Sequence, residues 1–209
     1  MPAEPIHAES TRPGPDTAGR ARPGLRERKK ERTRSTIRRE AFRLFHEQGY
    51  AATTVEQIAD AAEISPSTFF RYFPSKEQVV LADDLDPIMI QRFRDQPVEL
   101  SALEAFRRAT LESFEALDPA EFAFERDRAT FVATVPELRG VLAMEMDRNV
   151  DMIAELVAER SGRTPADFEV RALAGALIGA AKAVLMDRDP FDPTAIARVI
   201  AFLESGMRL

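Results

Sequence analysis

Apolar residues recur at helical spacing along most of the chain after residue 24. The clearest stripe occupies positions i, i+4, i+7 and i+8 of one segment, and its members are Ile37, Ala41, Leu44 and Phe45. This spacing predicts a first helix with one buried face, which ends before Gly49. The basic residues predicted to point away from that face are Arg38, Arg39 and Arg43.

Start signals place two short helices directly after the first. Thr54 precedes a second apolar stripe and has Gln57 three residues later, which predicts a capping box. Ser65 followed by Pro66 predicts the next start, because a hydroxyl cap precedes a proline whose missing N–H is not needed there. Pro74 ends this short helix, since the residue before a proline avoids helical geometry.

Prolines and caps divide the remainder into longer helices. Ser75, with Gln78 in the reciprocal position, predicts the next start, and Pro87 is predicted to break or kink the helix that follows. The expected helices cover residues 75–95, 98–117, 120–133, 136–161, 165–187 and 193–206. No segment alternates apolar and polar residues between turn signals, so the expected fold class is all-α.

Charge is distributed unevenly along the chain. Residues 1–76 hold 14 Lys and Arg against 10 Asp and Glu, whereas the rest is strongly acidic and the whole chain carries −6. Residues 1–24 are rich in proline and glycine and are expected to form a disordered basic tail. A basic amino end on an acidic body favours an anionic partner such as a phosphate backbone. A solvated arm that only aids solubility is the alternative.

Residues 54–73 have the length of a helix-turn-helix, whose second helix enters a DNA major groove. The second helix is too short to be stable alone, so Phe69 and Phe73 are expected to pin one side of it into the core. Hydroxyl, aromatic and basic side chains are left on its other faces, where they suit bases and phosphates. An ordinary core helix filled with aromatic residues is the alternative.

At this point the sequence resembles a known family. Residues 37–80 are similar to the DNA-binding domain of the TetR/AcrR family of bacterial transcription regulators, and the matching motifs include Gly49-Tyr50, Thr53-Thr54-Val55, Ile64-Ser65 and the run from Phe69 to Lys76. The strings 69–73 and 135–139 are also similar to a mainly actinobacterial subgroup that includes mycofactocin-linked regulators. In place of the family's usual turn glycine the chain has Glu63, which must avoid or tolerate a positive φ.

The resemblance implies roles for individual residues. Thr54 and Lys76 would hold phosphates, and the start of the recognition helix would face base edges with Ser65, Pro66, Ser67 and Thr68. The groove or its walls would be faced by Phe70, Arg71 and Tyr72. The implied domains are a basic tail at 1–24, a three-helix helix-turn-helix DNA-binding domain at 25–74, and a helical ligand-binding and dimerisation domain at 75–209.

The carboxyl half offers two further patterns. Small residues line the helix expected at 165–187, and the last helix carries the stripe Ile196, Val199, Ile200, Leu203 and Met207. The resemblance implies that these two helices form a four-helix homodimer interface, and burial in the subunit's own core is the alternative. The residues proposed to line a ligand pocket are Phe106, Phe114, Phe131, Met144 and Arg148, although aromatic residues at helical spacing are more often core. The arginines that could meet an anionic group are Arg126, Arg128 and Arg148, although solvated surface arginines are more common. Apolar lining with these arginines nearby favours an apolar guest with one anionic group, such as a lipid-like acid or an acyl thioester.

Composition excludes catalytic and metal chemistry. The chain has no cysteine, and its two histidines, His7 and His46, can form neither a metal cluster nor a triad. No phosphate-binding glycine loop and no Gly-x-Ser-x-Gly motif occurs. We therefore expect no enzyme activity, no catalytic residue, no metal and no cofactor. The crowded acids Asp83, Asp84 and Asp86 are expected to form a solvated turn.

The sequence also predicts where the protein acts. The longest apolar run, residues 172–186, contains Lys182 and is too short to span a bilayer, and no signal peptide is recognised. The resulting hypothesis is a cytoplasmic, homodimeric repressor that a small, mainly apolar inducer releases from a palindromic DNA operator. The alternative is a helical interaction module whose basic arm docks an acidic protein or a membrane surface.

Overall fold

The computed structural model describes residues 24–83, 85–186 and 188–208, and these ranges are helical with no β-strand. The elements are α1 (Leu25–Gln48), α2 (Val55–Ala61), α3 (Pro66–Tyr72), α4 (Lys76–Leu81), α5 (Asp86–Asp95), α6 (Ala102–Glu115), α7 (Pro119–Thr134), the 3-10 turn η1 (Pro136–Leu138), α8 (Arg139–Ser161), α9 (Phe168–Leu185) and α10 (Pro193–Glu204). The all-α prediction is confirmed. Most of the predicted tail, residues 1–23, lies outside the described residues.

The predicted helix starts have the expected local geometry. The backbone N–H of Gln57 donates to the Thr54 hydroxyl at 3.3 Å, and the Gln57 side chain accepts from the Thr54 N–H at 2.9 Å. The Ser65 hydroxyl accepts from the Thr68 N–H at 3.2 Å. These bonds satisfy N–H groups that have no partner in the first turn of a helix, so the caps fix where α2 and α3 begin.

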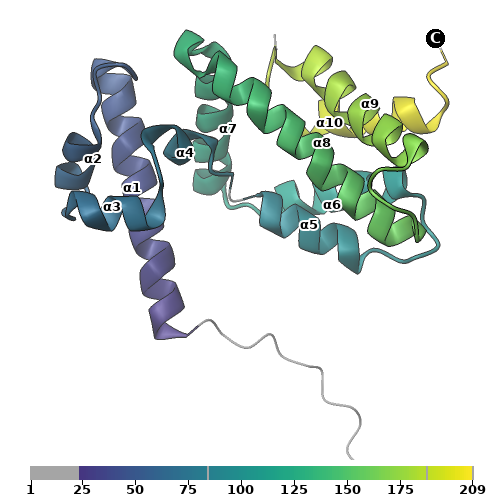
Figure 1. Ribbon diagram of the computed structural model, residues 1–209, viewed down its shortest axis with the longest axis horizontal. Coiled ribbons are helices and arrows are strands. Elements are labelled where there is room, and N and C mark those ends of the chain that lie inside the picture. Colours follow the sequence, from purple (N-terminus) through teal and green to yellow (C-terminus); the bar gives the residue numbers. More distant parts are fainter. Residues whose placement is uncertain (1–23, 84, 187, 209) are drawn as a thin grey trace, which may run out of the picture.

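The helix expected over 75–95 is two helices, with the break just before Pro87. α4 ends at Leu81, and α5 starts at Asp86 with Pro87 in its first turn. At the break the Asp83 carboxylate accepts from the Leu85 N–H at 2.8 Å. This is the segment that leads from the amino-terminal helices into the rest of the molecule (Figure 1).

Two hydrophobic clusters form the core, and α7 belongs to the first of them. That cluster gathers side chains of α1–α4 and continues into Phe131, Val132 and Leu138. Phe131 stacks on Phe45 with ring centroids 5.5 Å apart, and Phe42 meets Phe124 edge-on at 5.3 Å. The second cluster is built from α5, α6, α8, α9 and α10. α7 is therefore the helix of the carboxyl half on which the amino-terminal bundle packs.

A buried chain of charges follows the same contact, and it corrects one prediction. Arg38 does not point away from the core: its Nη2 donates to Glu125 Oε1 of α7 at 2.8 Å. Arg128 Nε donates to the other oxygen of Glu125 at 2.6 Å, and Arg128 Nη2 pairs with Asp83 at the α4–α5 break. The side chains of Arg38, Glu125 and Arg128 are 3%, 6% and 7% exposed. The apolar spacing predicted a solvated Arg38, because spacing within one helix does not show a buried partner 87 residues away.

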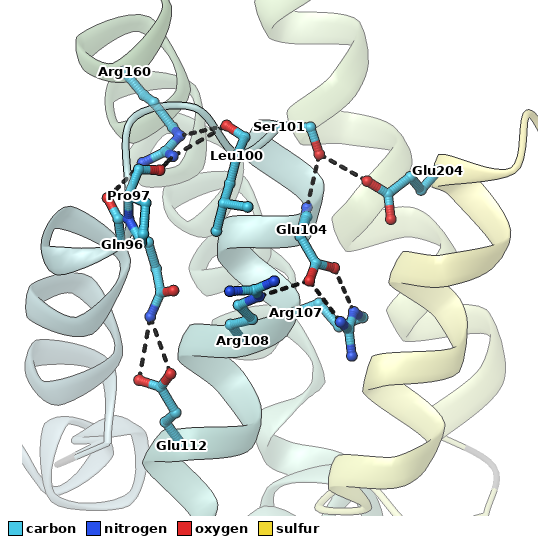
Figure 2. Close-up of polar contacts among 10 residues, drawn as sticks. All are labelled: Gln96, Pro97, Leu100, Ser101, Glu104, Arg107, Arg108, Glu112, Arg160 and Glu204. Carbon is cyan, nitrogen blue, oxygen red and sulfur yellow. Dashed lines mark hydrogen bonds and ion pairs between the residues drawn. The ribbon is translucent and has the colours of Figure 1, made fainter.

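Hydrogen bonds from one arginine fix the loop between α5 and α6. Figure 2 shows Arg160 of α8 reaching the carbonyl oxygens of Gln96, Pro97 and Leu100, with donor–acceptor distances of 3.4 Å to Gln96 and 3.1 Å to Leu100. The Gln96 side chain donates to Glu112 of α6. The guanidinium thereby satisfies carbonyls at the end of α5 and ties that end to the carboxyl-half core.

Replacing Glu125 by alanine leaves two buried guanidinium groups without their shared carboxylate. We expect the free energy of unfolding to fall by about 3–5 kcal/mol, as for other broken buried ion pairs. Glu159→Ala is the matched control, because Glu159 pairs with Arg94 at 3.0 Å on an exposed surface and should cost less than about 1 kcal/mol. Urea unfolding followed by circular dichroism at one protein concentration measures both. Equal losses in the two variants would contradict a buried, shared carboxylate.

Candidate functional sites

The turn between α2 and α3 is a Schellman motif built on a non-glycine residue. Glu63 has φ +55°, its N–H donates to Asp60 O at 3.0 Å, and the Ile64 N–H donates to Ala59 O at 2.9 Å. This paired pattern ends helices that stop in the left-handed conformation. The sequence left open whether Glu63 avoids or tolerates a positive φ. The structure shows that it tolerates one, and the turn retains the helix-turn-helix geometry.

One face of α3 is buried against the protein and the other is exposed. Phe69 and Phe73 are buried, as the spacing predicted, and pin the helix against the first cluster. Tyr72 and Thr68 are partly buried, and the open side of the helix with its cap consists of Ser65, Pro66, Ser67, Phe70 and Arg71. Phe70 is 51% exposed although it is a large apolar residue. An aromatic side chain left in water beside hydroxyls and an arginine is suited to contacts with base edges.

The exposed groups of α3 are partly pre-arranged. The Ser65 hydroxyl lies 2.9 Å from that of Ser67 and 3.0 Å from that of Thr68, so three hydroxyls cluster at the helix start. The Arg71 guanidinium lies over the Tyr72 ring, 5.6 Å from its centroid. These contacts restrict the side chains before any partner arrives, which lowers the entropy lost on binding.

The basic stretch of α1 begins beside this unit. Arg34 lies over the Phe73 ring at 4.8 Å, which places the amino-terminal half of α1 next to the end of α3. The exposed cations on that half are Arg26, Arg28, Lys29, Lys30 and Arg32. A row of cations next to an exposed recognition helix is the charge distribution expected of a surface that follows phosphates.

The ammonium group of Lys76 already makes hydrogen bonds within the protein. Its Nζ donates to Tyr50 O at 2.8 Å and to Thr53 O at 2.9 Å, and it lies 4.2 Å from the centre of the Tyr50 ring. An ammonium group has three donors, so one is left for a phosphate. Lys76 therefore ties the α1–α2 connection to α4, a role that sequence reasoning missed. Thr54, the other predicted phosphate contact, is exposed at the start of α2.

The five predicted pocket residues do not lie around one cavity. Phe106 stacks on Phe93 in the second cluster, whereas Phe131 belongs to the first. Phe114 packs against Phe122 and Phe191. Met144 is 61% exposed. Arg148 pairs with Glu145 on the surface. Periodicity identified apolar residues correctly but not which of them border empty space.

A half-open cavity of about 220 Å³ lies elsewhere, between the α4–α5 break, α7, α8 and the α9–α10 connection. Its apolar walls include Leu81, Val132, Leu142, Met146, Met186 and Phe191. Its polar lining residues are Asp83, Asp86, Arg128, Glu145 and Asn149. The cavity thus borders the buried chain of charges through Asp83 and Arg128.

The acids of the α4–α5 break are not a solvated turn. Asp83 is paired with Arg128, and Asp86 lines the cavity. Burial, followed by the charge of Asp83, raises the pKa of Asp86 to about 7. Sequence reasoning missed both roles because nothing local marks these aspartates as facing inward, and Asp84 lies outside the described residues.

An open cleft of about 730 Å³ separates α1 from the starts of α5 and α7. Basic and acidic groups alternate along it, with Arg34, Arg38 and Arg39 on α1 and Asp118 and Glu121 at the start of α7. Both acids cap α7: Asp118 accepts from the Glu121 N–H at 2.9 Å and Glu121 accepts from the Asp118 N–H at 3.3 Å. The cleft runs beside the same α1–α7 contact that the buried charges cross.

The described ranges contain neither a metal site nor a membrane span. No group of three or more His, Cys, Asp or Glu residues there is placed to hold a metal ion. None of the helices formed by those residues is both long and apolar enough to cross a membrane.

Comparison with known proteins decides between a DNA-binding unit and a general interaction module. Residues 37–82 match the family model of bacterial regulatory proteins of the tetR family, and residues 100–208 match that of the MftR C-terminal domain. The chain belongs to the TetR family of bacterial regulatory proteins. The match of the carboxyl half also confirms the resemblance to mycofactocin-linked regulators. Members of this family are transcriptional regulators, and this chain is a member.

Individual relatives agree with this assignment. The chain is 38% identical over 150 residues to the transcriptional regulator TcmR of Streptomyces glaucescens, a match covering 67% of this chain and 65% of TcmR. It is 30% identical over 138 residues to the transcriptional repressor KstR2 of Mycolicibacterium smegmatis, covering 62% of this chain and 67% of KstR2. The chain therefore spans about two thirds of the length of these relatives.

Solved structures share the fold. The TetR-family repressor FadR of Thermus thermophilus, solved with lauroyl-CoA, aligns over 84% of this chain and 95% of its own with a TM-score of 0.50 and 24% identity. At this identity the likeness concerns the arrangement of helices alone.

Replacing Glu63 by glycine in this TetR-family regulator tests the strained turn. The left-handed conformation costs a residue with a Cβ roughly 1–2 kcal/mol, and glycine's extra freedom in the unfolded chain offsets about 0.5–1 kcal/mol of the relief. We expect a net gain of about 0.5–1 kcal/mol in the free energy of unfolding. Glu63→Ala keeps the Cβ and removes the rest of the side chain with its charge, so it separates backbone strain from effects of the carboxylate. A gain for alanine as large as for glycine would show that strain is not the cause.

Proposed function

We propose that this regulator is a homodimeric, ligand-responsive repressor that a small, mainly apolar molecule releases from a palindromic operator. One observation supports the DNA-binding part most directly: α3 is fixed from behind by Phe69 and Phe73 while its polar face and Phe70 are exposed. A helix presented in this way can enter a major groove without rearranging. KstR2, a relative, is named as a transcriptional repressor.

In this proposal the contacts to DNA divide into two kinds. Thr54, Lys76 and the cations of α1 contact phosphates and give affinity, whereas the exposed groups of α3 contact base edges and give specificity. The residues assigned to base edges and groove walls are Ser65, Pro66, Ser67, Thr68, Phe70, Arg71 and Tyr72. We assign residues 25–74 to DNA binding and 75–209 to ligand binding and dimerisation, with action in the cytoplasm.

The exposed side of α9 and α10 is the proposed dimer interface. Small side chains on α9 are exposed, namely Ala172, Ala176, Gly179 and Ala183, and Val184 is exposed beside them. On α10, Val199 and Ile200 are buried in the subunit's own core, whereas Phe202 is 39% exposed. Small residues allow close helix approach, so two copies can pair these helices around a two-fold axis.

The cavity beside the α4–α5 break is the proposed ligand site, in place of the five residues expected from sequence. Its walls include Asp83 and Arg128, which continue through Glu125 to Arg38 of α1. A ligand that binds one arrangement of these charges better than another shifts the position of α1, and with it the spacing of the two recognition helices. Release from the operator follows from that shift.

Replacing Thr68 by alanine tests the assigned recognition helix. The operator is first selected from fragments of the source organism's DNA, and affinities for operator and random DNA are then measured at several salt concentrations. We expect the preference for the operator to fall by about 1–3 kcal/mol, with affinity for random DNA unchanged. Thr130→Ala, in the exposed part of α7, is the matched control and should leave both affinities unchanged. A module that docks proteins or membranes would show no operator preference in the wild type.

A further inference from the structure

The charged lining of the cavity is mainly acidic, so it does not suit the guest with an anionic group that the sequence predicted. We propose that it accepts a compact apolar molecule that carries a protonated amine, with the amine directed at the Asp86 carboxylate. This inference rests on the proposed function, because it names the chemical class of the inducer.

The arginines expected to receive an anion are already paired with carboxylates. Arg126 donates to Asp189 at 2.6 Å, and Arg148 donates to Glu145 at 3.1 Å. Arg128 is the only cation that lines the cavity among the described residues, and it bonds both Glu125 and Asp83. An anionic guest would have to displace one of these partners and leave a buried charge uncompensated.

Asp86 is in the opposite situation. Its carboxylate lines the cavity and makes no hydrogen bond or ion pair with any residue that the structure describes. The other carboxylates on the wall have partners: Asp83 has Arg128, and Glu145 has Arg148. Among the described residues, Asp86 is therefore the acid on the wall that has no direct hydrogen-bond or ion-pair partner, and a cation in the cavity would supply one.

The raised pKa of Asp86 has the same origin and gives a second observable. Burial and the negative charges of Asp83, Glu145 and Glu125 raise this pKa, and Arg128 opposes them. A folded-state pKa of about 7 means that the folded protein holds a proton that the unfolded chain has lost. Stability therefore falls as the pH rises from about 4 towards 7, and a bound ammonium group allows Asp86 to ionise without that loss.

Size and lining determine the rest of the guest. A volume of about 220 Å³ is below the roughly 300–1,000 Å³ of sites for drug-sized ligands, so one aromatic ring on a short chain fills it. Met146 and Met186 contribute flexible side chains, and Phe191 contributes an aromatic face. These residues suit an aromatic ring, and the acidic lining residues suit the amine.

Three probes that share one body but differ in their head group test the inference. Phenylpropylamine, phenylpropanol and phenylpropanoate are titrated against the full chain, with thermal shift and calorimetry as readouts. At pH 8 we expect the amine to bind at least about tenfold more tightly than the alcohol, the size of effect expected when a charge-assisted bond replaces a neutral one. Its affinity should decrease towards pH 5.5, where Asp86 is protonated and must release a proton on binding.

The variant Asp86→Asn keeps the shape of the side chain and removes its charge. The amine's advantage over the alcohol should disappear in this variant, together with the pH dependence of its binding. Glu155→Gln, on the exposed side of α8 and outside the cavity, is the matched control and should retain both. Circular dichroism verifies that each variant is folded.

Three results would overturn the inference: tighter binding of phenylpropanoate than of the amine, an unchanged amine preference in Asp86→Asn, or binding of none of the three probes. Operator selection and affinity, measured without any probe, test the proposed function separately. A wild-type protein that selects an operator but ignores the amine would retain the repressor proposal and remove the cationic inducer.

Discussion

The arrangement of this protein depends on one buried carboxylate, Glu125, that is shared by Arg38 of α1 and Arg128 of α7. Burying three charges is costly, and their attraction compensates only when the geometry is good and the remaining donors are satisfied. The aromatic contacts of Phe42 and Phe45 with Phe124 and Phe131 of α7 accompany these ion pairs. The amino-terminal bundle is thus attached to the rest of the chain by a directional contact as well as by apolar packing.

That attachment determines which movements are available. Arg128, which holds Glu125, also holds Asp83 at the α4–α5 break. Arg128 and Asp83 both line the cavity. In the proposed mechanism, a guest there would act on groups already connected to α1. Release would then require that the guest bind one arrangement of these charges better than the other.

Local chemistry explains which features were predictable. The caps Thr54 and Ser65 and the break before Pro87 each depend on residues a few positions apart, and each agrees with the structure. The sequence left the backbone of Glu63 open, and the structure shows it left-handed. The burial of Arg38 and the placement of the cavity depend on partners far away in sequence, and neither was predicted. Periodicity shows that a residue is apolar or polar but not whether its neighbour in space is a helix, a carboxylate or empty volume.

The distance between the two recognition helices of the dimer tests the central claim most directly. The chain has no cysteine, so Asp60→Cys, at the exposed end of α2 before the turn into α3 and without an assigned DNA contact, provides a single spin-label position on each subunit that reports the spacing of the recognition helices. Double electron–electron resonance should give one narrow distribution of distances between the two labels in the otherwise unaltered protein. On operator DNA this distance should be compatible with half-sites about 34–36 Å apart. Adding Glu125→Gln should broaden or split the distribution while the fold persists by circular dichroism. An unchanged narrow distribution would contradict the claim that Glu125 holds the DNA-binding unit in place.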